Sequence, residues 1–568
     1  MKRWLWFSLC ALLGLLLLLC GWLIPAHLRA VEEPVLRQAG LNSSSLTGRG
    51  VTLAHTGQYG SGEMLLRAAQ RAKFSDTNEL VAALDTEAKK SPVVKLWGAT
   101  PGTLRNYFPK NPKPTDTNFT DFVVREENRT KALGTLSKSK QPEVLALIQS
   151  RTLTNLTTFA PSGSPGGEAF DTAVAITGIL AEQNKITPGL SKDIESAATQ
   201  ANQTGKTEAL EQSLLDILSL GQRFNWGQLV TFVERMDGAE TLHQQAELAR
   251  NADEQLPDLF AAVELSGDPK AVAQYLKDFP KTGYADMTAA FPYNANAVRA
   301  LVRSGHRLFA SPLRQTAART EPLASLVAIG ADYSWRTPEF TLILKWFLIF
   351  AGGFFLALAL HVGRRPASDL EAPLQVRGFH VARELLFALG FLLVVVLLSE
   401  PFLAQQGPAA AMPFRLRIPT AGSVIQPGNT DLKTSFMDKS RLIPMAVFFV
   451  LQGLLYISSI VKLAEIRRQR VGPRVKLRLL ENEEHLFDAG LYLGFLGTVC
   501  AFILSSISQK HSFDLMVAYS STAFGILFVS IFKIFHLRPT RRKLLLEAEV
   551  EQPAVAAPTT NPVPSPAS

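Results

Sequence analysis

The chain has 568 residues, enough for two or more domains, and 47% of them are hydrophobic, which fits a protein that is part membrane and part soluble. The formal net charge is +9, but the Arg and Lys clusters flank apolar segments as they do in membrane proteins, so the charge gives no support to nucleic-acid binding. The three cysteines, Cys10, Cys20 and Cys500, all lie in apolar segments, which excludes a disulfide framework and a CxxC metal site.

Residues 1–30 contain the first apolar segment. A basic start at Lys2 precedes an almost uninterrupted apolar run over 4–24. The run is longer than the roughly 7–15 residues of a signal-peptide core, and neither Ala26 nor Ala30 gives a clean small-x-small cleavage pattern. The sequence therefore predicts an N-terminal membrane anchor, with a signal peptide as the alternative.

Residues 31–338 contain no segment long enough to cross a bilayer, and they show short amphipathic helices separated by Gly and Pro. The apolar run 170–180 is too short to span and predicts a buried core helix. Asn225 with Gln228 predicts a capping box, and Asp268 before a proline predicts another helix start. We expect this region to be a large soluble helical domain.

Two motifs in this domain have both a functional and a structural interpretation. Residues 51–54 are the best strand candidate, and 55–63 (HTGQYGSGE) resemble a phosphate loop in composition but match neither GxxxxGK nor GxGxxG. A plain loop before a helix is the alternative. His243 shares one helix face with Glu240 and Glu247, which suits a metal site or a solvated face with local ion pairs. No catalytic constellation is found, so we expect no enzyme, no metal and no cofactor.

Beyond residue 338 the sequence becomes largely apolar. A crossing helix needs about 20 mostly apolar residues, and five further candidates have this character. They are 340–362, 385–398, 443–461, 489–505 and 515–534. We expect Lys345 to snorkel to the membrane interface and Glu400 to lie at it. The predicted fold class is an integral membrane, all-α protein with about six transmembrane helices and a large soluble helical outer (periplasmic) domain.

Basic residues set the predicted orientation. With six spans, the basic groups all fall on one side of the membrane, which is then the cytoplasm. The groups begin at Lys2, Arg364, Arg467 and Arg538. The predicted location is the bacterial inner (cytoplasmic) membrane, with multiple spans, both termini in the cytoplasm and the large domain in the periplasm.

The predicted domain organisation follows from these spans. It comprises a membrane anchor or signal peptide at 1–30, an extracytoplasmic helical domain at 31–338, a five-helix region at 339–537, and a cytoplasmic basic segment with a disordered Pro/Ala-rich tail at 538–568. Within the five-helix region, 405–441 is predicted to be an outer loop and 463–487 a basic cytoplasmic loop.

The last two apolar segments carry small and hydroxyl residues at helical spacing. Small residues let helix backbones approach closely, and hydroxyls bond across the contact, so these faces are expected to meet protein and not lipid. The candidate helix-contact or channel-lining residues are Gly494, Gly497, Thr498, Ser505, Ser521, Thr522 and Gly525.

The sequences LGFLGTV at 493–499 and STAFG at 521–525 resemble the second and third helices of the MotA/TolQ/ExbB proton-channel family. In that family a Gly-Thr-Val and a Thr-Ala-x-Gly line the channel, so the resemblance implies that Thr498 and Thr522 line a path. It also implies that 443–461 corresponds to the family's first helix, and that a single-span partner subunit carries a membrane carboxylate. The chain differs from the family in its short turn, its small cytoplasmic insertion and its outer domain.

Two classes of function follow from these observations. One is a non-enzymatic subunit of an envelope complex whose terminal hairpin works as in proton-channel or stator subunits. The other is a membrane-anchored scaffold whose periplasmic helical domain binds a partner protein without ion conduction. In both cases the partners are membrane lipid and protein, a homo-oligomer is compatible with either, and no nucleic acid is expected.

Overall fold

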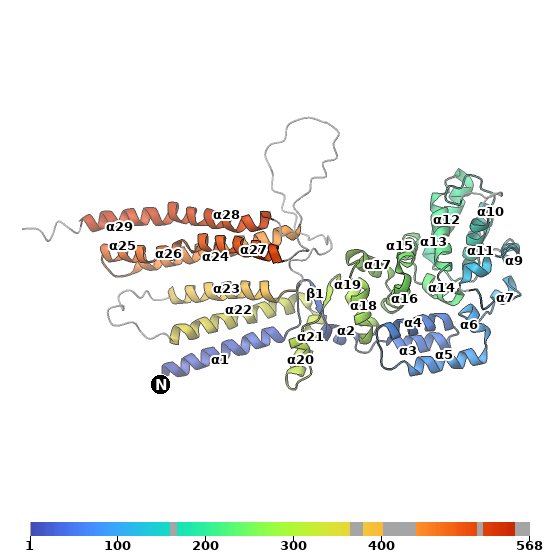
Figure 1. Ribbon diagram of the computed structural model, residues 1–568, viewed down its shortest axis with the longest axis horizontal. Coiled ribbons are helices and arrows are strands. Elements are labelled where there is room, and N and C mark those ends of the chain that lie inside the picture. The colour runs from blue at the N-terminus through green and yellow to red at the C-terminus, as the bar shows by residue number, and fades with distance from the viewer. Residues whose placement is uncertain are drawn as a thin grey trace, which may run out of the picture. The chain divides into compact units, whose positions relative to one another are not determined.

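The computed structural model describes residues 2–116, 118–159, 167–363, 379–401, 439–507 and 515–550. These residues are predominantly helical, which confirms the all-α prediction. They form two compact units (Figure 1). We call them the membrane unit, Met1–Arg29 with Thr337–Ser568, and the helical domain, Ala30–Arg336.

The membrane unit contains every apolar segment predicted to span. Its elements are α1 (Lys2–Leu23), α22 (Pro338–Gly363), α23 (Phe379–Ser399), α24 (Lys439–Arg468), α25 (Pro473–Asn482), α26 (Glu484–Phe487), α27 (Ala489–Ile507), α28 (Leu515–Phe532), the π-helical turn η4 (Lys533–Leu537) and α29 (Arg538–Val550). Among the described residues, four helical stretches are long and apolar enough to cross a membrane. They are Trp4–Leu23, Pro338–Gly363, Phe448–Arg468 and Tyr519–Val550. Four such helices fit a membrane protein.

Helices α1, α22 and α23 pack side by side (Figure 1). Glycines allow the close approach of α1 to α22, because a Cβ atom on Gly14 would lie 3.0 Å from the carbonyl oxygen of Gly352. A Cβ on Gly353 would lie 2.8 Å from the ring of Phe391, on α23. Small residues therefore define both helix contacts, as is usual in membranes.

A buried group of charges joins these three helices near one end. The ammonium of Lys345 donates to the carbonyl of Ala26 at 2.5 Å and lies 3.4 Å from Oε1 of Glu400. Oε2 of Glu400 accepts the N–H of Leu28 at 3.0 Å and lies 3.3 Å from Nδ1 of His27. The Lys345 side chain is 3% exposed, so its ammonium is buried in the protein and does not reach solvent as that of a snorkelling lysine would. The lysine stays inside because it finds a carboxylate and a carbonyl there.

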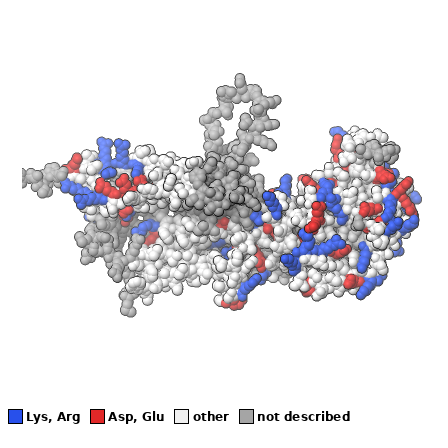
Figure 2. Space-filling view, in the orientation of Figure 1, with Lys and Arg blue, Asp and Glu red and all other residues white. Residues whose placement is uncertain are grey.

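Helices α24, α27 and α28 form the second group of the membrane unit, and α25, α26 and α29 cap one end of it (Figure 1). An apolar cluster holds this end together. Its buried members are Leu463, Ile466, Leu480, Phe487, Phe532 and Leu544. Lys533 pairs with Asp488 at 2.7 Å beside the cluster. In Figure 2, Lys, Arg, Asp and Glu side chains crowd this end, whereas most of the visible surface along the helices is uncharged.

Some predicted features of the membrane unit lie outside the described residues. They are residues 405–438 of the predicted outer loop 405–441, the basic group at Arg364 and Arg365, and the Pro/Ala-rich tail from residue 551.

The helical domain is a series of short helices. Its elements are β1 (Ala30–Glu32), α2 (Glu33–Gly40), α3 (Leu46–His55), α4 (Tyr59–Arg71), α5 (Asn78–Lys90), α6 (Val93–Trp97), α7 (Leu104–Tyr107), α8 (Phe119–Val123), α9 (Glu126–Leu136), α10 (Pro142–Ser150), α11 (Gly167–Glu182), α12 (Pro188–Thr204), α13 (Glu208–Gly221), α14 (Trp226–Val233), α15 (Ala239–Ala252), η1 (Asp253–Gln255), α16 (Leu256–Ser266), α17 (Pro269–Asp278), α18 (Gly283–Ala290), η2 (Phe291–Tyr293), α19 (Asn294–Ser304), β2 (Arg307–Phe309), α20 (Pro312–Ala317) and α21 (Leu323–Arg336).

The strand prediction for 51–54 is wrong, because these residues lie inside α3. The helix begins where the Ser45 hydroxyl accepts the N–H of Gly48 at 3.0 Å, and its apolar face is buried in the domain. Tertiary packing has overridden a weak local strand preference. In the described part of the chain, strands occur only at β1 and β2, which pair in parallel from Ala30–Arg307 to Glu32–Phe309.

The local helix signals of this domain are confirmed. The run 170–180 lies in α11, which is buried along most of its length. Asn225 and Gln228 form the predicted capping box, with both hydrogen bonds at 3.0 Å. Asp268 caps α17 by accepting the N–H of Ala271 at 3.1 Å. Such signals are legible because both partners lie within one turn of the chain.

A fragment spanning Ala30–Arg336 is expected to fold alone and to stay soluble without detergent, because its own helices close a continuous apolar core. Its circular dichroism should be dominated by helix. Its melting temperature should not change with reducing agent, since the fragment contains no cysteine. Precipitation without detergent, or a sheet-dominated spectrum, would contradict this expectation.

Candidate functional site

The close contact between α27 and α28 defines the candidate site, which we call the terminal hairpin. A Cβ atom on Gly494 would lie 2.9 Å from the carbonyl oxygen of Ser521, and one on Gly525 would lie 2.6 Å from the carbonyl oxygen of Gly490. A Cβ on Gly497 would lie 2.6 Å from the Ser521 hydroxyl. The two backbones thus approach so closely at Gly494 and Gly525 that no larger side chain fits without moving a helix.

Three hydroxyl groups surround one backbone carbonyl in this contact, and we call them the hydroxyl cluster. The carbonyl oxygen of Gly494 lies 3.1 Å from Oγ1 of Thr498, 3.2 Å from Oγ of Ser521 and 3.1 Å from Oγ1 of Thr522. The two threonine oxygens lie 2.6 Å apart. A carbonyl oxygen has two lone pairs, so the three hydroxyls share it and can exchange donor and acceptor roles.

The structure brings six of the seven candidate residues into this one contact. Gly494, Gly497 and Gly525 supply the close approach, and the hydroxyl cluster supplies the polar atoms. Ser521 is 1% exposed and Thr498 is 8% exposed, so both are buried in the unit. Ser505 belongs to α27, but its side chain lies outside the part of the chain that the structure describes.

Gln452 of α24 belongs to the same site and was not among the sequence candidates. Its Nε2 donates to the carbonyl of Gly490 at 2.9 Å, and the side chain is only 1% exposed. A Cβ on Gly525 would lie 3.3 Å from this Nε2, so three helices meet at the amide. The signal was present in the sequence, since a polar residue inside an apolar segment is a functional candidate by default.

The polar residues singled out around His243 serve local pairing. Nδ1 of His243 lies 2.9 Å from Oδ2 of Asp216 and 3.0 Å from Nε2 of Gln212, both on α13. Arg250 also pairs with Asp216, at 2.9 Å. Within the described ranges, no group of three or more His, Cys, Asp and Glu side chains is placed to hold a metal ion.

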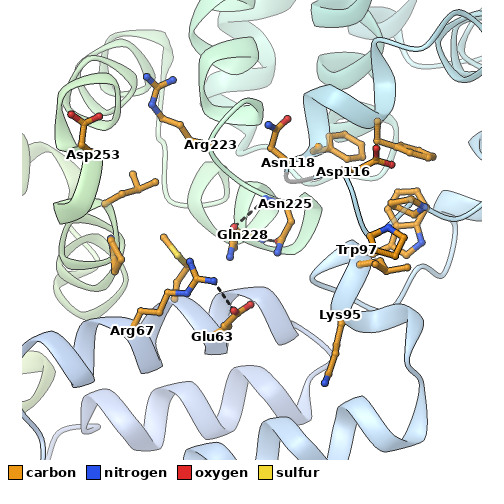
Figure 3. Close-up of a pocket in the computed structure, with 18 of the residues that line it drawn as sticks. Glu63, Arg67, Lys95, Trp97, Asp116, Asn118, Arg223, Asn225, Gln228 and Asp253 are labelled. Carbon is orange, nitrogen blue, oxygen red and sulfur yellow. Dashed lines mark hydrogen bonds and ion pairs between the residues drawn. The ribbon is translucent and has the colours of Figure 1, made fainter.

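A polar cleft of about 460 Å³ lies in the helical domain (Figure 3). Asn225 and Gln228 lie at its centre, and Glu63 and Arg67 of α4 pair with each other at 2.7 Å along one side. Charged residues of both signs surround it. They are Glu63, Arg67, Lys95, Asp116, Arg223, Asp253 and Glu254. A lining of mixed charge suits a polar or zwitterionic surface better than an apolar small molecule.

The Gly-rich motif at 55–63 is explained by packing beside this cleft. The N–H of Gly60 donates to the carbonyl of Gly98 at 2.7 Å. A Cβ on Gly60 would lie 2.5 Å from Oδ1 of Asn225, and one on Gly98 only 1.9 Å from it. The glycines therefore let the start of α4 approach α6 and α14, which agrees with the interpretation as a plain turn before a helix.

Comparisons of the chain with protein-family models, with curated proteins and with solved structures give no match. The resemblance of 493–499 and 521–525 to the MotA/TolQ/ExbB family therefore stays a prediction.

Proposed function

We propose that this chain is a non-enzymatic subunit of a bacterial inner-membrane complex and that its hydroxyl cluster takes part in proton transfer. The observation that carries the proposal is the Thr498–Thr522 hydroxyl pair, 2.6 Å apart over the carbonyl of Gly494. Polar groups inside membrane helices are costly and usually functional. The resemblance to the proton-channel family points to the same two threonines.

Hydroxyl groups suit proton transfer but do not carry charge at neutral pH. A hydroxyl that accepts a proton on one side can release its own on the other, so a chain of hydroxyls relays protons without storing them. The cluster contains no carboxylate among its described residues. We therefore assign the ionisable carboxylate to a partner subunit with a single membrane span, as the family resemblance implies.

The spacing of the oxygens favours a proton over a metal cation. Oxygen ligands surround a hard cation such as Ca²⁺ at roughly 2.3–2.6 Å, and the cation must fit between them. The oxygens of Thr498 and Thr522 lie only 2.6 Å apart and are bonded directly to each other. No cation fits between them unless the helices separate, whereas a proton needs no additional space.

The proposed topology has six spans, with both termini in the cytoplasm and the helical domain in the periplasm. Four stretches already meet the length and hydropathy of a span. Helices α23, with 21 residues, and α27, with 19 residues, are the two that complete the set. This arrangement puts the basic loop 463–487 on the cytoplasmic side, in keeping with the distribution of Lys and Arg.

Thr498→Val and Thr522→Val are expected to abolish proton transfer while leaving the protein folded. Valine keeps the side-chain shape and removes the hydroxyl, and one such bond in a membrane protein is worth about 0.6 kcal/mol. The measurement is proton uptake by inverted membrane vesicles from cells that make the complete complex, together with the melting temperature of the purified chain in detergent.

Thr341→Val is the matched control for these variants. Thr341 is 1% exposed in α22, and its hydroxyl donates to the carbonyl of Thr337, the residue just before this helix, at 2.8 Å. This variant should conduct normally. If Thr498→Val and Thr522→Val also conduct normally, the proton-transfer proposal is wrong.

The second candidate function is a scaffold, and the cleft of the helical domain favours it. The cleft has a volume of about 460 Å³, and the charges of both signs around it suit a protein surface. A scaffold whose spans only anchor it would keep its function in both valine variants. The experiment above therefore separates the two candidates.

A further inference from the structure

We infer that Gln452 and the Tyr456–His536 pair form the inner half of the proton path, between the hydroxyl cluster and the cytoplasmic end of α24 and α28. This inference rests on the proposed function and adds residues to the same site. The proton then leaves for the cytoplasm through residues of this chain, after it has passed the threonines of the hydroxyl cluster.

The first observation is an unsatisfied oxygen at Gln452. The side chain is 1% exposed, and its Nε2 is held by the carbonyl of Gly490 at 2.9 Å, which fixes the direction of the amide. Its Oε1 has no hydrogen-bond donor among the described residues. A buried carbonyl oxygen without a donor costs about 1–3 kcal/mol, so a residue that only packed would be better apolar. The oxygen is therefore available to a mobile donor.

The second observation is the Tyr456–His536 hydrogen bond at the inner end. Oη of Tyr456 lies 3.0 Å from Nε2 of His536, and both side chains are half-buried. An imidazole accepts a proton on one nitrogen and releases one from the other, so this pair can move a proton between the helix contact and water. Phe528 and Phe532 pack against the tyrosine ring and keep it in place.

The third observation is the π turn in which His536 lies. The helix widens over Lys533–Leu537, between α28 and α29, and π turns of this kind recur at functional sites. The two polar side chains of the turn, those of Lys533 and His536, both bond to residues outside it. Lys533 pairs with Asp488 at 2.7 Å, and His536 bonds to Tyr456. The turn thus presents these groups to α24 and to the start of α27.

These groups follow one another along the same helix faces. Gln452 and Tyr456 are four residues apart on α24, so their Cβ atoms are about 5–6 Å apart on one face. Gly490 and Gly494, whose carbonyls accept from Gln452 and from the hydroxyl cluster, are likewise one turn apart on α27. The order from the inside outward is His536 with Tyr456, then Gln452 at Gly490, then the hydroxyl cluster at Gly494.

The proton moves along this order by hops, and in each hop one O–H or N–H bond forms while another breaks. It passes between hydroxyls by exchange, reaches a water molecule held by Oε1 of Gln452, and is handed to Tyr456 and His536, which release an equivalent proton to the cytoplasm. Each passage leaves the hydroxyls reversed in direction and His536 in its other tautomer, so the hydroxyls rotate back and the imidazole returns to its first tautomer before the next proton passes.

The test uses the full chain in its native complex, in inverted membrane vesicles with a pH-sensitive dye. Tyr456→Phe removes one hydroxyl and keeps the ring, and Gln452→Met replaces the amide by an apolar chain of similar length. Each should lower the proton flux roughly tenfold or more, which corresponds to about 1.4 kcal/mol on the barrier. The melting temperature of the Tyr456→Phe protein should be unchanged, so this variant decides the matter if Gln452→Met folds poorly.

Ser459→Ala is the matched control for these two variants. Ser459 is buried on α24, and its hydroxyl bonds to the carbonyl of Leu455 in its own helix at 3.0 Å. Its removal should leave the proton flux unchanged.

The outcomes separate this inference from the proposed function. If Tyr456→Phe and Gln452→Met conduct like the unmodified protein while Thr498→Val does not, the inner half is misassigned and the proposed function stands. Unchanged flux in Thr498→Val, or no flux that depends on this chain, overturns both. A flux of Na⁺ without a pH change also overturns both.

Discussion

Replacing Lys345 by methionine is expected to destabilise the membrane unit by about 3 kcal/mol, because it leaves a buried carboxylate without its cationic partner. The Glu400 side chain is fully buried, and the Lys345 ammonium is 3.4 Å from it. Removing one member of a buried pair costs about 3–5 kcal/mol, and we expect the lower end because His27 remains beside the carboxylate. The measurement is the melting temperature of the purified chain in detergent.

Two comparisons make this prediction specific. Adding Glu400→Gln to Lys345→Met should recover most of the loss, because no uncompensated charge then stays buried. Lys462→Met is the matched single variant. Lys462 is likewise paired, with the carboxylates of Glu465 and Glu483, but its side chain is 30% exposed. It should cost less than about 1 kcal/mol. Equal melting temperatures for the two lysine variants would contradict the role given to burial.

Gly525→Ala is expected to weaken the terminal hairpin by about 1–3 kcal/mol, because the new methyl group would overlap the neighbouring backbone. Its Cβ would lie 2.6 Å from the carbonyl oxygen of Gly490, which can move only if α27 moves. Gly497→Ala should cost less, since the atom nearest its Cβ is the hydroxyl oxygen of Ser521, which can rotate away. Gly497→Leu should be as severe as Gly525→Ala, because a branched side chain separates the helices.

Gly453 provides the control for the glycine series. It lies beside Gln452 on α24, and an added Cβ would meet no described atom within 4 Å. Gly453→Ala should therefore be neutral or slightly stabilising, since alanine favours the helix. The melting temperature should be highest for Gly453→Ala, lower for Gly497→Ala and lowest for Gly525→Ala. If Gly453→Ala lowers the melting temperature as much as Gly525→Ala does, the close backbone contact at Gly525 is not the reason that alanine is destabilising there.

The sequence was most informative where the signal and its partner lie close together in the chain. The capping box at Asn225 and Gln228 and the cap at Asp268 need only one turn of helix, so their pattern is complete in a few letters. The small faces around Gly494 and Gly525 are equally local, because helical spacing places them on one side. Which atoms meet across the contact was not predictable from spacing.

Predictions from the sequence were wrong or incomplete where contacts with residues far away in the chain determine the structure. The sequence predicts that Lys345 snorkels, whereas the structure buries its ammonium against Ala26 and Glu400, which follow α1 and α23 and are far away in the chain. Residues 51–54 have a local strand preference, and the sequence of this short segment does not reveal that it packs against α5. The polar side chain of Gln452 inside an apolar segment is visible in the sequence, but its acceptor, a backbone carbonyl of α27, is not.

The parallel pairing of β1 with β2 has a consequence for the order of assembly. Helices α1 and α22 pack together, yet roughly 300 residues separate them in the chain, and closing a flexible loop of that length costs about 5 kcal/mol of entropy. In the folded helical domain, β1 bonds to β2 and α2 packs on α21, so its entry and exit segments are already tied to each other. A domain that folds first would therefore shorten the effective loop to a few residues. In that order of folding, the pairing of α1 with α22, and with it the burial of Lys345, follows the folding of the helical domain.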